Sequence, residues 1–167
     1  MNDCLFFGEN EFPIIFKNEP DSITKPIQFK FENENENENE KQIKQISSAD
    51  FSTIFLFENG KAIEYLNYSK QKPEEIQIEN IQKVTVGWRN EAILTIEGNV
   101  FAKGINIDLQ NANKFINISS LIEDKNDRII QDIVSGYSSI YLLTSNQNAY
   151  GIGSNDSGQF GFRFYNT

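Results

Sequence analysis

The side chains that usually carry enzymatic chemistry are scarce in this sequence. It contains no histidine and one cysteine, Cys4. Without histidine, the Ser-His-Asp triad, the common zinc sites and histidine-dependent proton transfer are absent. Two adjacent carboxylate pairs remain as acid–base candidates, Glu74-Glu75 and Glu123-Asp124. Adjacent side chains rarely aim at one substrate atom, so we interpret both pairs as parts of solvated loops.

A glycine-rich stretch offers a second kind of chemistry. Residues 151–158 read Gly-Ile-Gly-Ser-Asn-Asp-Ser-Gly, and such loops can cradle phosphate with backbone amides. That function needs the N-terminus of a helix directly after the loop. The next residues, 160–162, read Phe-Gly-Phe and show no helical pattern. The sequence therefore predicts no enzyme, no cofactor and no metal site.

Three residues are better suited to binding another protein. Trp88 and Tyr137 each follow a glycine, and Arg89 comes directly after the tryptophan. Aromatic and arginine side chains contribute much of the binding energy at protein interfaces. We therefore take Trp88, Arg89 and Tyr137 as candidate partner contacts. Packing of the two aromatic rings between neighbouring structural units is the competing interpretation.

Internal repeats position these residues. A constant shift of 49 positions carries Gly87 onto Gly136, and a shift of 38 positions upstream carries Gly87 onto Ala49. The N-terminal fragment 4–10 matches the end of a repeat and is expected to be the last strand of a repeat whose earlier strands are absent. The repeats cover residues 43–68, 81–106 and 130–161. The glycines that recur or stand at repeat ends are Gly8, Gly60, Gly87, Gly98, Gly104, Gly136, Gly153, Gly158 and Gly161.

Each repeat is expected to contain a hairpin. A first strand ends at the small residue, and an apolar second strand follows. The second strands are predicted at 54–57, 92–96 and 140–143, and the third strands at 62–65, 100–103 and 149–152. The turns between them, 58–60, 97–99 and 146–148, contain Gly and Asn, which supply positive φ. Residues 76–78 and 115–119 alternate apolar and polar side chains and are predicted fourth strands.

These features predict the fold class. Four-stranded antiparallel units that repeat about every 40–50 residues are typical of propeller blades. The 14 phenylalanines and 6 tyrosines also suit strands better than helices. We therefore expect an all-β chain, residues 1–167, with the antiparallel four-stranded blades of an incomplete β-propeller. A parallel β-helix is the structural alternative, but the hairpin within each unit argues against it.

One stretch falls outside the repeats. Residues 32–40 alternate Glu and Asn, and because neither face is apolar we expect a disordered low-complexity insertion. A lure for a basic partner is the functional alternative. The tract ends an irregular excursion over residues 11–40, in which only 27–31 is predicted as a strand.

Charge and composition limit the partners and the compartment. With 15 basic against 24 acidic residues, the net charge is −9, which disfavours direct nucleic-acid binding and anionic membranes. There is no apolar run of the roughly 20 residues that cross a bilayer, and the N-terminus does not resemble a secretory signal. A single cysteine suits a reducing compartment. We expect a cytoplasmic or nuclear protein that is not secreted.

The third repeat resembles the regulator of chromosome condensation family. Its Leu143-Thr144 strand, the Gly-x-Asn of 153–155 and the closing Gly-Gln-Phe-Gly of 158–161 are similar to that family's repeat. The family's repeats often carry a histidine after the first glycine, which this chain lacks. The resemblance implies a ring of about seven blades. It also implies a second candidate function, guanine-nucleotide exchange on a small GTPase.

The sequence therefore predicts a non-catalytic repeat module for protein–protein interaction. The alternative is a guanine-nucleotide exchange factor, or part of one, for a small GTPase. Three repeats and one strand do not fill a ring, so closing it would need self-association or additional chain.

Overall fold

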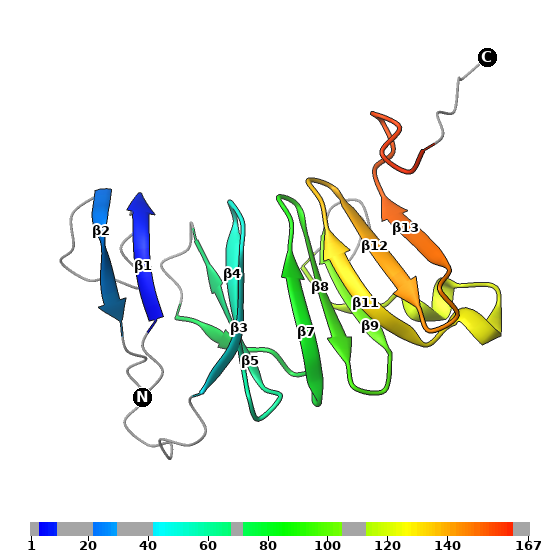
Figure 1. Cartoon of the computed structure of the whole chain (residues 1–167), viewed down its shortest axis with the longest axis horizontal. Helices are drawn as coiled ribbons and strands as arrows, with labels where there is room; N and C mark the ends of the chain where they lie inside the picture. Colours follow the sequence, from blue (N-terminus) through cyan, green and yellow to red (C-terminus); the bar gives the residue numbers. More distant parts are fainter. Residues whose placement is uncertain (1–3, 10–21, 30–41, 68–71, 105–112, 162–167) are drawn as a thin grey trace.

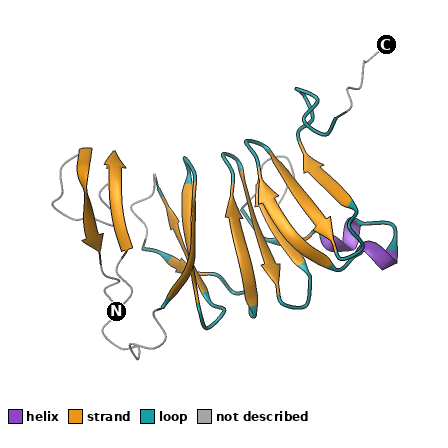
Figure 2. Ribbon diagram, in the orientation of Figure 1, coloured by secondary structure: helices purple, strands orange, loops and turns teal. Residues whose placement is uncertain are grey.

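The computed structural model describes the backbone of residues 4–9 and 22–29 and complete residues over 42–67, 72–104 and 113–161. These residues form a row of separate small antiparallel sheets (Figure 1). Strands predominate, and the only helices among the described residues are two short 3-10 turns (Figure 2). No helix in the described part is long and apolar enough to span a membrane. The fold class predicted from the repeats, all-β with antiparallel propeller blades, is confirmed.

Each of the three repeats forms one blade. Blade 1 contains β3 (Ile43–Ser48), β4 (Ser52–Phe57), β5 (Ala62–Leu66) and β6 (Glu74–Glu75). Blade 2 contains β7 (Ile81–Val86), β8 (Asn90–Thr95), β9 (Val100–Gly104) and β10 (Ile116–Asn117). Blade 3 contains β11 (Ile130–Ser135), β12 (Ser139–Thr144) and β13 (Ala149–Gly153). The 3-10 helices η2 (Ser119–Leu121) and η3 (Lys125–Asp127) connect blades 2 and 3.

A hairpin precedes blade 1 in the chain. It pairs β1 (Cys4–Glu9) with β2 (Ser22–Phe29), and its register shifts between Phe6 and Gly8. The sequence predicted a strand at 27–31, but β2 begins five residues earlier, at Ser22, and ends at Phe29. The Glu-Asn tract over 32–40 lies outside the described residues.

The fourth strand of blade 1 corrects two predictions. We predicted a strand at 76–78, but β6 consists of Glu74 and Glu75, which pair with Glu64 and Ile63 of β5. The Ile76 amide still donates to the Ala62 carbonyl at 2.9 Å, so the pairing ends there. The two glutamates are therefore exposed strand residues rather than loop residues. In blade 2, β10 lies within the predicted 115–119 segment.

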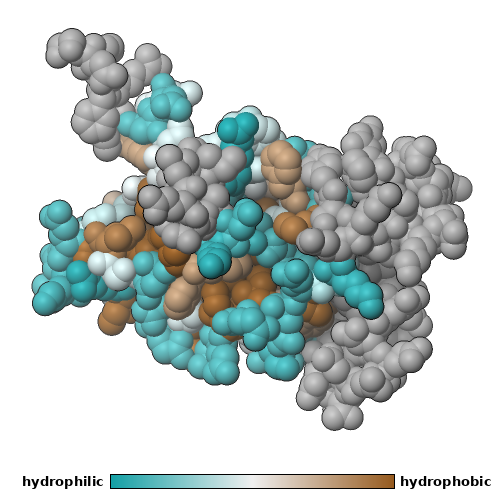
Figure 3. Space-filling view, turned by 180° about the vertical axis from the view of Figure 1, so that it is seen from behind, coloured by the Kyte–Doolittle hydropathy of each residue, from teal (hydrophilic) through white to brown (hydrophobic). Residues whose placement is uncertain are grey.

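The middle strands carry the core because both of their faces are covered. Every residue of β4 and β8 is buried, since each strand lies inside its blade and the blades stack face to face. One apolar cluster joins blade 1 to blade 2 and consists of Ile54, Leu56, Ala62, Ile76, Ile81, Val84, Val86 and Ile93. A second joins blade 2 to blade 3 and consists of Ala92, Leu94, Val100, Ala102, Ile118, Ile122, Ile130, Ile133, Ile140 and Leu142. Viewed from behind, apolar side chains are visible across the middle of the face, with hydrophilic ones along its lower edge (Figure 3).

The turns between second and third strands have one conformation in all three blades. Gly60, Gly98 and Gln147 have φ of 79°, 80° and 66°, and each amide donates at 3.0 Å to the carbonyl three residues before it. We expected Gly or Asn to supply the positive φ, and in blade 3 a glutamine does so instead. The Gly60 and Gly98 carbonyls accept from the Ile81 and Ile130 amides at 3.0 Å, which fixes where the next blade begins.

Hydrogen bonds between first strands tie adjacent blades together. The Ser47 hydroxyl accepts from the Val86 amide at 2.9 Å, and the Thr85 hydroxyl accepts from the Ser135 amide at the same distance. These bonds repeat one contact at both blade boundaries. The first strands are therefore held in a common register along the row.

One position on the first strands uses a different bond at each boundary. Gln45 is bonded to the Val84 backbone, donating to its carbonyl at 2.8 Å and accepting from its amide at 3.1 Å. Lys83, the equivalent residue of blade 2, instead forms an ion pair with Asp132, with 2.6 Å between Nζ and Oδ1. Asp132 is the equivalent residue of blade 3.

Candidate functional site

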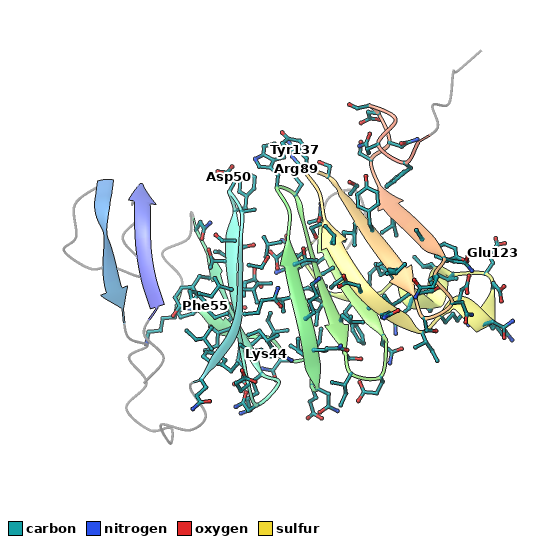
Figure 4. The ribbon with its side chains drawn as sticks, viewed as in Figure 1. Lys44, Asp50, Phe55, Arg89, Glu123 and Tyr137 are labelled. Atoms are coloured by element: carbon teal, nitrogen blue, oxygen red, sulfur yellow. The ribbon has the colours of Figure 1, made fainter. Side chains whose placement is uncertain are left out.

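The loops that join first to second strands lie at one edge of the row. They comprise residues 49–51, 87–89 and 136–138. Figure 4 shows Asp50, Arg89 and Tyr137 together at this edge, whereas Glu123 lies far from it. We call Asp50, Phe51, Trp88, Arg89 and Tyr137 the aromatic rim.

Three aromatic rings touch in sequence along the rim. The Trp88 and Tyr137 rings are stacked, with 4.3 Å between centroids and 12° between planes. The Phe51 ring lies 5.6 Å from the Trp88 ring at a tilt of 60°. Offset or tilted rings at these separations attract one another beyond the area that they bury. The three rings come from three different blades, so the row of blades assembles this surface.

Polar contacts fix the Trp88 indole from its other sides. Its Nε1–H donates to Asp50 Oδ2 at 3.0 Å. The Arg89 guanidinium carbon lies 4.1 Å from the indole centroid, which is a cation–π contact. The Arg89 amide donates to the Tyr137 carbonyl at 3.1 Å, so the two loops are also joined through their backbones. The indole is therefore held in one orientation.

The rim remains accessible despite these contacts. Tyr137 is 66% exposed and Phe51 is 47% exposed, while Trp88 is half-buried and Arg89 is exposed. The structure thus brings Trp88, Arg89 and Tyr137 into direct contact. Trp88 does pack between blades, which was the competing interpretation. Tyr137 and Phe51 keep much of their surface in solvent.

The glycines that precede the rim aromatics allow two backbones to meet. A Cβ added at Gly87 would collide with the Gly136 carbonyl oxygen of the next blade. A Cβ at Gly104, which has a φ of 139°, would collide with the Arg89 carbonyl oxygen. Side chains at these positions would push the blades or the rim loop apart. Of the other glycines, Gly153, Gly158 and Gly161 have φ of 113°, 71° and 84°.

Asp50 and Phe51 were not singled out in the sequence. Asp50 occupies the place of Trp88 and Tyr137 in the first repeat, at the shift of 38 positions. Because equivalent positions of neighbouring blades lie at the same edge, that shift was the signal that could have found it. Phe51, one position further along, has no aromatic equivalent in the other two repeats.

A buried ionic cluster lies between blades 1 and 2. We call Ser52, Glu64, Glu91 and Lys103 the acid–lysine cluster. Lys103 Nζ lies 2.6 Å from Glu64 Oε2 and 3.4 Å from Glu91 Oε2, and the Ser52 hydroxyl donates to Glu91 Oε1 at 2.6 Å. The three charged side chains are only 10–14% exposed. Two carboxylates thus share one ammonium group.

The buried surroundings of Glu91 change its protonation. Burial raises the pKa of Glu91 from its ordinary 4.5 to about 7, against the lowering effect of Lys103. The Glu64 carboxylate raises this pKa further, and the Ser52 hydrogen bond lowers it. Glu91 therefore gains and loses its proton near neutral pH.

The acid–lysine cluster joins blades 1 and 2, and its charged groups are nearly inaccessible to solvent. The equivalent layer between blades 2 and 3 is apolar, since Ala102, Ile140 and Ile152 stand at the places of Glu64, Glu91 and Lys103. The sequence signal for this cluster was charged residues at positions where the other repeats have uncharged ones.

The other residues that the sequence singled out make local contacts. The Asp124 side chain accepts from the Asn126 amide at 2.9 Å and caps η3, while Glu123 is exposed. In the glycine-rich stretch, the Ser154 hydroxyl donates to Asp156 at 2.8 Å. The Phe160 ring lies so close to Gly151 that a Cβ there would collide with it.

Sequence reasoning missed a further buried carboxylate, Asp127. It accepts hydrogen bonds from Tyr150 and Asn148 at 2.7 Å and from Asn146 at 3.1 Å. These bonds, the Tyr150 hydroxyl first, lower the pKa of Asp127. Asp127 thereby ties the segment between blades 2 and 3 to the turn of blade 3. The described residues contain no group of three or more His, Cys, Asp or Glu arranged to hold a metal ion.

Comparisons with known proteins define the fold. No protein-family model matches the chain, and no curated protein matches its sequence. Among solved structures, it is similar to human WBSCR16, with a TM-score of 0.69 and 13% identity over 92% of this chain and 43% of that one. It is also similar to Prp20p from Saccharomyces cerevisiae, with a TM-score of 0.64 and 14% identity over 85% of this chain and 36% of that one.

A third similar structure is yeast RCC1 (Prp20) bound to Kap60. It has a TM-score of 0.62 and 15% identity over 81% of this chain and 34% of that one. The chain thus spans between 34% and 43% of the length of these structures. At such identities the similarity concerns the fold. In fold, the chain is a set of consecutive RCC1-type β-propeller blades.

Proposed function

We propose that the aromatic rim is a binding surface for another protein. The observation that carries this proposal is the ladder of Phe51, Trp88 and Tyr137, whose outer rings are exposed although the middle ring is fixed. Exposed tyrosine, tryptophan and arginine side chains are enriched where proteins bind each other. Loops presented by a rigid scaffold are also the usual place for such contacts.

Preorganisation strengthens this proposal. Ordering a flexible side chain during association costs about 0.5–1.5 kcal/mol. At the rim, ring stacking and the Asp50 hydrogen bond already fix Trp88, and a backbone hydrogen bond joins the loops of Arg89 and Tyr137. A partner would meet a surface that is largely ordered before binding.

The test compares two variants with matched exposure. Tyr137→Ala removes a rim ring that is 66% exposed, and Ile96→Ala removes an apolar side chain that is 65% exposed in the turn at the opposite ends of the strands. Each purified chain is used as bait in lysate of the source organism, and captured proteins are quantified by mass spectrometry. We expect Tyr137→Ala to lose partners that the wild-type chain and Ile96→Ala retain. Equal capture by all three chains would refute a rim-based function.

The same experiment distinguishes simple protein binding from the alternative function, nucleotide exchange. The structure of Prp20p is described with that protein's binding properties to Gsp1p and histones. For this chain, exchange activity rests on the resemblance of its repeats. Capture is therefore repeated after removing nucleotide by chelating Mg²⁺, and again with excess GTP. A small GTPase retained only in the stripped state would favour exchange over simple binding.

Ring closure is part of the same proposal. We expect self-association or additional chain to cover the outer face of blade 3, where Val134 is 54% exposed. Light scattering of the purified chain checks the first route, since a dimer is expected if copies complete a ring. A monodisperse monomer would exclude self-association.

A further inference from the structure

The charge of Arg89 has no carboxylate partner in the described part of the chain. The ion pairs found there are Lys61–Glu75, Lys83–Asp132, Lys103–Glu64 and Lys103–Glu91. The Arg89 guanidinium instead lies against the Trp88 ring, and its backbone amide is bonded to Tyr137. Stacking occupies a face of this planar group, while its N–H donors lie along the edges. The edges of an exposed, oriented guanidinium are thus available to an acceptor from outside.

Apolar surface lies on the same rim. Tyr137, which is 66% exposed, stacks on the indole that Arg89 covers, and Phe51, which is 47% exposed, contacts the same indole. The oriented cation and the two exposed aromatic rings therefore all contact the same indole. This arrangement suits a ligand that combines one negative charge with a large apolar group.

We propose that the rim selects a protein segment in which an aspartate or glutamate adjoins a large apolar side chain. This inference rests on the proposed function and adds the chemistry of the partner. The carboxylate would accept from the Arg89 guanidinium, which matches its two oxygens in a fork. The neighbouring apolar side chain would pack on Tyr137 or Phe51.

A carboxylate fits this site better than a phosphate group. Phosphorylated segments carry about −1.5 to −2 charges and are usually bound by clusters of arginines. The rim has one described arginine, and the Asp50 carboxylate is bonded to the same indole. The overall charge of −9 does not exclude an acidic ligand, because charges more than about 8–10 Å away are largely screened at physiological salt.

Trp88 makes the test direct because it is the single tryptophan of the chain. Its indole N–H gives one identifiable NMR resonance, which is followed during titration with the peptides Ac-Phe-Glu-NH₂ and Ac-Phe-Gln-NH₂. These differ only in the end of one side chain, which is a charged carboxylate in the first and a neutral amide in the second. For an exposed ion pair we expect the glutamate peptide to bind about threefold to tenfold more tightly. Arg89→Gln should abolish this preference and leave weak binding of both peptides.

A thermal unfolding curve of Arg89→Gln serves as the control for folding, since the side chain is exposed and its backbone bond remains. The inference is overturned if wild type binds both peptides equally or neither of them. It is also overturned if Arg89→Gln keeps the preference. The same holds if inorganic phosphate displaces the glutamate peptide as effectively as the acetyl-capped glutamate amide does. Failure of the proposed function looks different, because Tyr137→Ala would then capture the same proteins as wild type.

Discussion

The Lys103 ammonium of blade 2 lies 2.6 Å from the Glu64 carboxylate of blade 1. The pair is almost fully buried, and it draws in Glu91 at 3.4 Å from the same nitrogen. Burying three charges costs desolvation energy that their attraction only partly offsets. Blades 1 and 2 are thus joined through a costly polar layer, while blades 2 and 3 use apolar side chains at the same level.

That contrast predicts opposite effects for single and combined substitutions. Lys103→Ile alone leaves two buried carboxylates without a cation, so we expect a loss of about 3 kcal/mol in the free energy of unfolding. Combining Glu64→Ala, Glu91→Ile and Lys103→Ile copies the layer between blades 2 and 3. The triple variant should be as stable as wild type or up to about 3 kcal/mol more stable. Urea unfolding measures the free energy of unfolding of both variants. A triple variant less stable than Lys103→Ile would contradict the prediction.

Stability should fall as the pH rises towards neutrality. The folded pKa of Glu91 is about 7, above its ordinary 4.5, so the folded chain binds this proton more tightly than the unfolded chain. The resulting stabilisation is fully present below pH 4.5 and is lost as the pH rises through about 7. Its size is on the order of 3 kcal/mol. Urea midpoints between pH 5 and pH 8 measure the decline.

Glu91→Gln is the control for this pH effect. A glutamine keeps the shape and does not titrate, so its stability should be nearly constant across the same range. The pKa values of Asp127 and Asp132 are lowered, so their stabilising effects are lost only in more acidic solution. A decline that persists unchanged in Glu91→Gln would assign the effect to another group.

Gly87 should tolerate no side chain. Its Cβ would meet the Gly136 carbonyl oxygen and also Asn90 Oδ1 at 2.8 Å, so Gly87→Ala forces blades 2 and 3 apart at the rim. We expect a loss of about 2–3 kcal/mol. Gly161→Ala provides the comparison, because its φ is 84° but no atom lies within 4 Å of the added Cβ. That variant should lose only about 1 kcal/mol. Thermal unfolding distinguishes them, and equal losses would rule out the collision.

Gln147→Gly should stabilise blade 3. Gln147 has a φ of 66°, where glycine stands in the other two blades, and its side chain makes only an exposed bond to Gln131. Relief of this backbone strain is expected to be worth about 0.5–1 kcal/mol. Ser145→Gly, in the same turn but without positive φ, should lower stability instead. Melting temperatures of the two variants therefore move in opposite directions.

The repeats predicted much of the fold because each blade is a local unit. Hairpin positions follow from apolar runs and turn residues within about 25 positions, and neighbouring blades reuse them. The fourth strand was placed wrongly in blade 1, since β6 carries Glu74 and Glu75, an exposed pair with no apolar alternation. The position of β6 is set by its pairing with β5, and the local sequence pattern does not indicate this pairing.

The sites were only partly predictable for the same reason. Trp88 and Tyr137 stood out as aromatic residues at equivalent positions, but their stacking depends on how closely blades 2 and 3 approach. That approach depends on Gly87 and Gly136 meeting across the boundary. The acid–lysine cluster draws Glu64 from one repeat and Lys103 from the next, so no pattern within a single repeat indicates it.

The changing bond at one repeat position restricts how such a chain can be rearranged. Gln45 is matched to a backbone, whereas Lys83 is matched to the side chain of Asp132. If blade 2 were duplicated in place, Lys83 of the first copy would face the lysine of the second copy instead of Asp132, whereas the backbone that Gln45 binds would be unchanged. Duplication of blade 2 alone would therefore place two like charges at the new boundary, and the longer row would need a compensating substitution there.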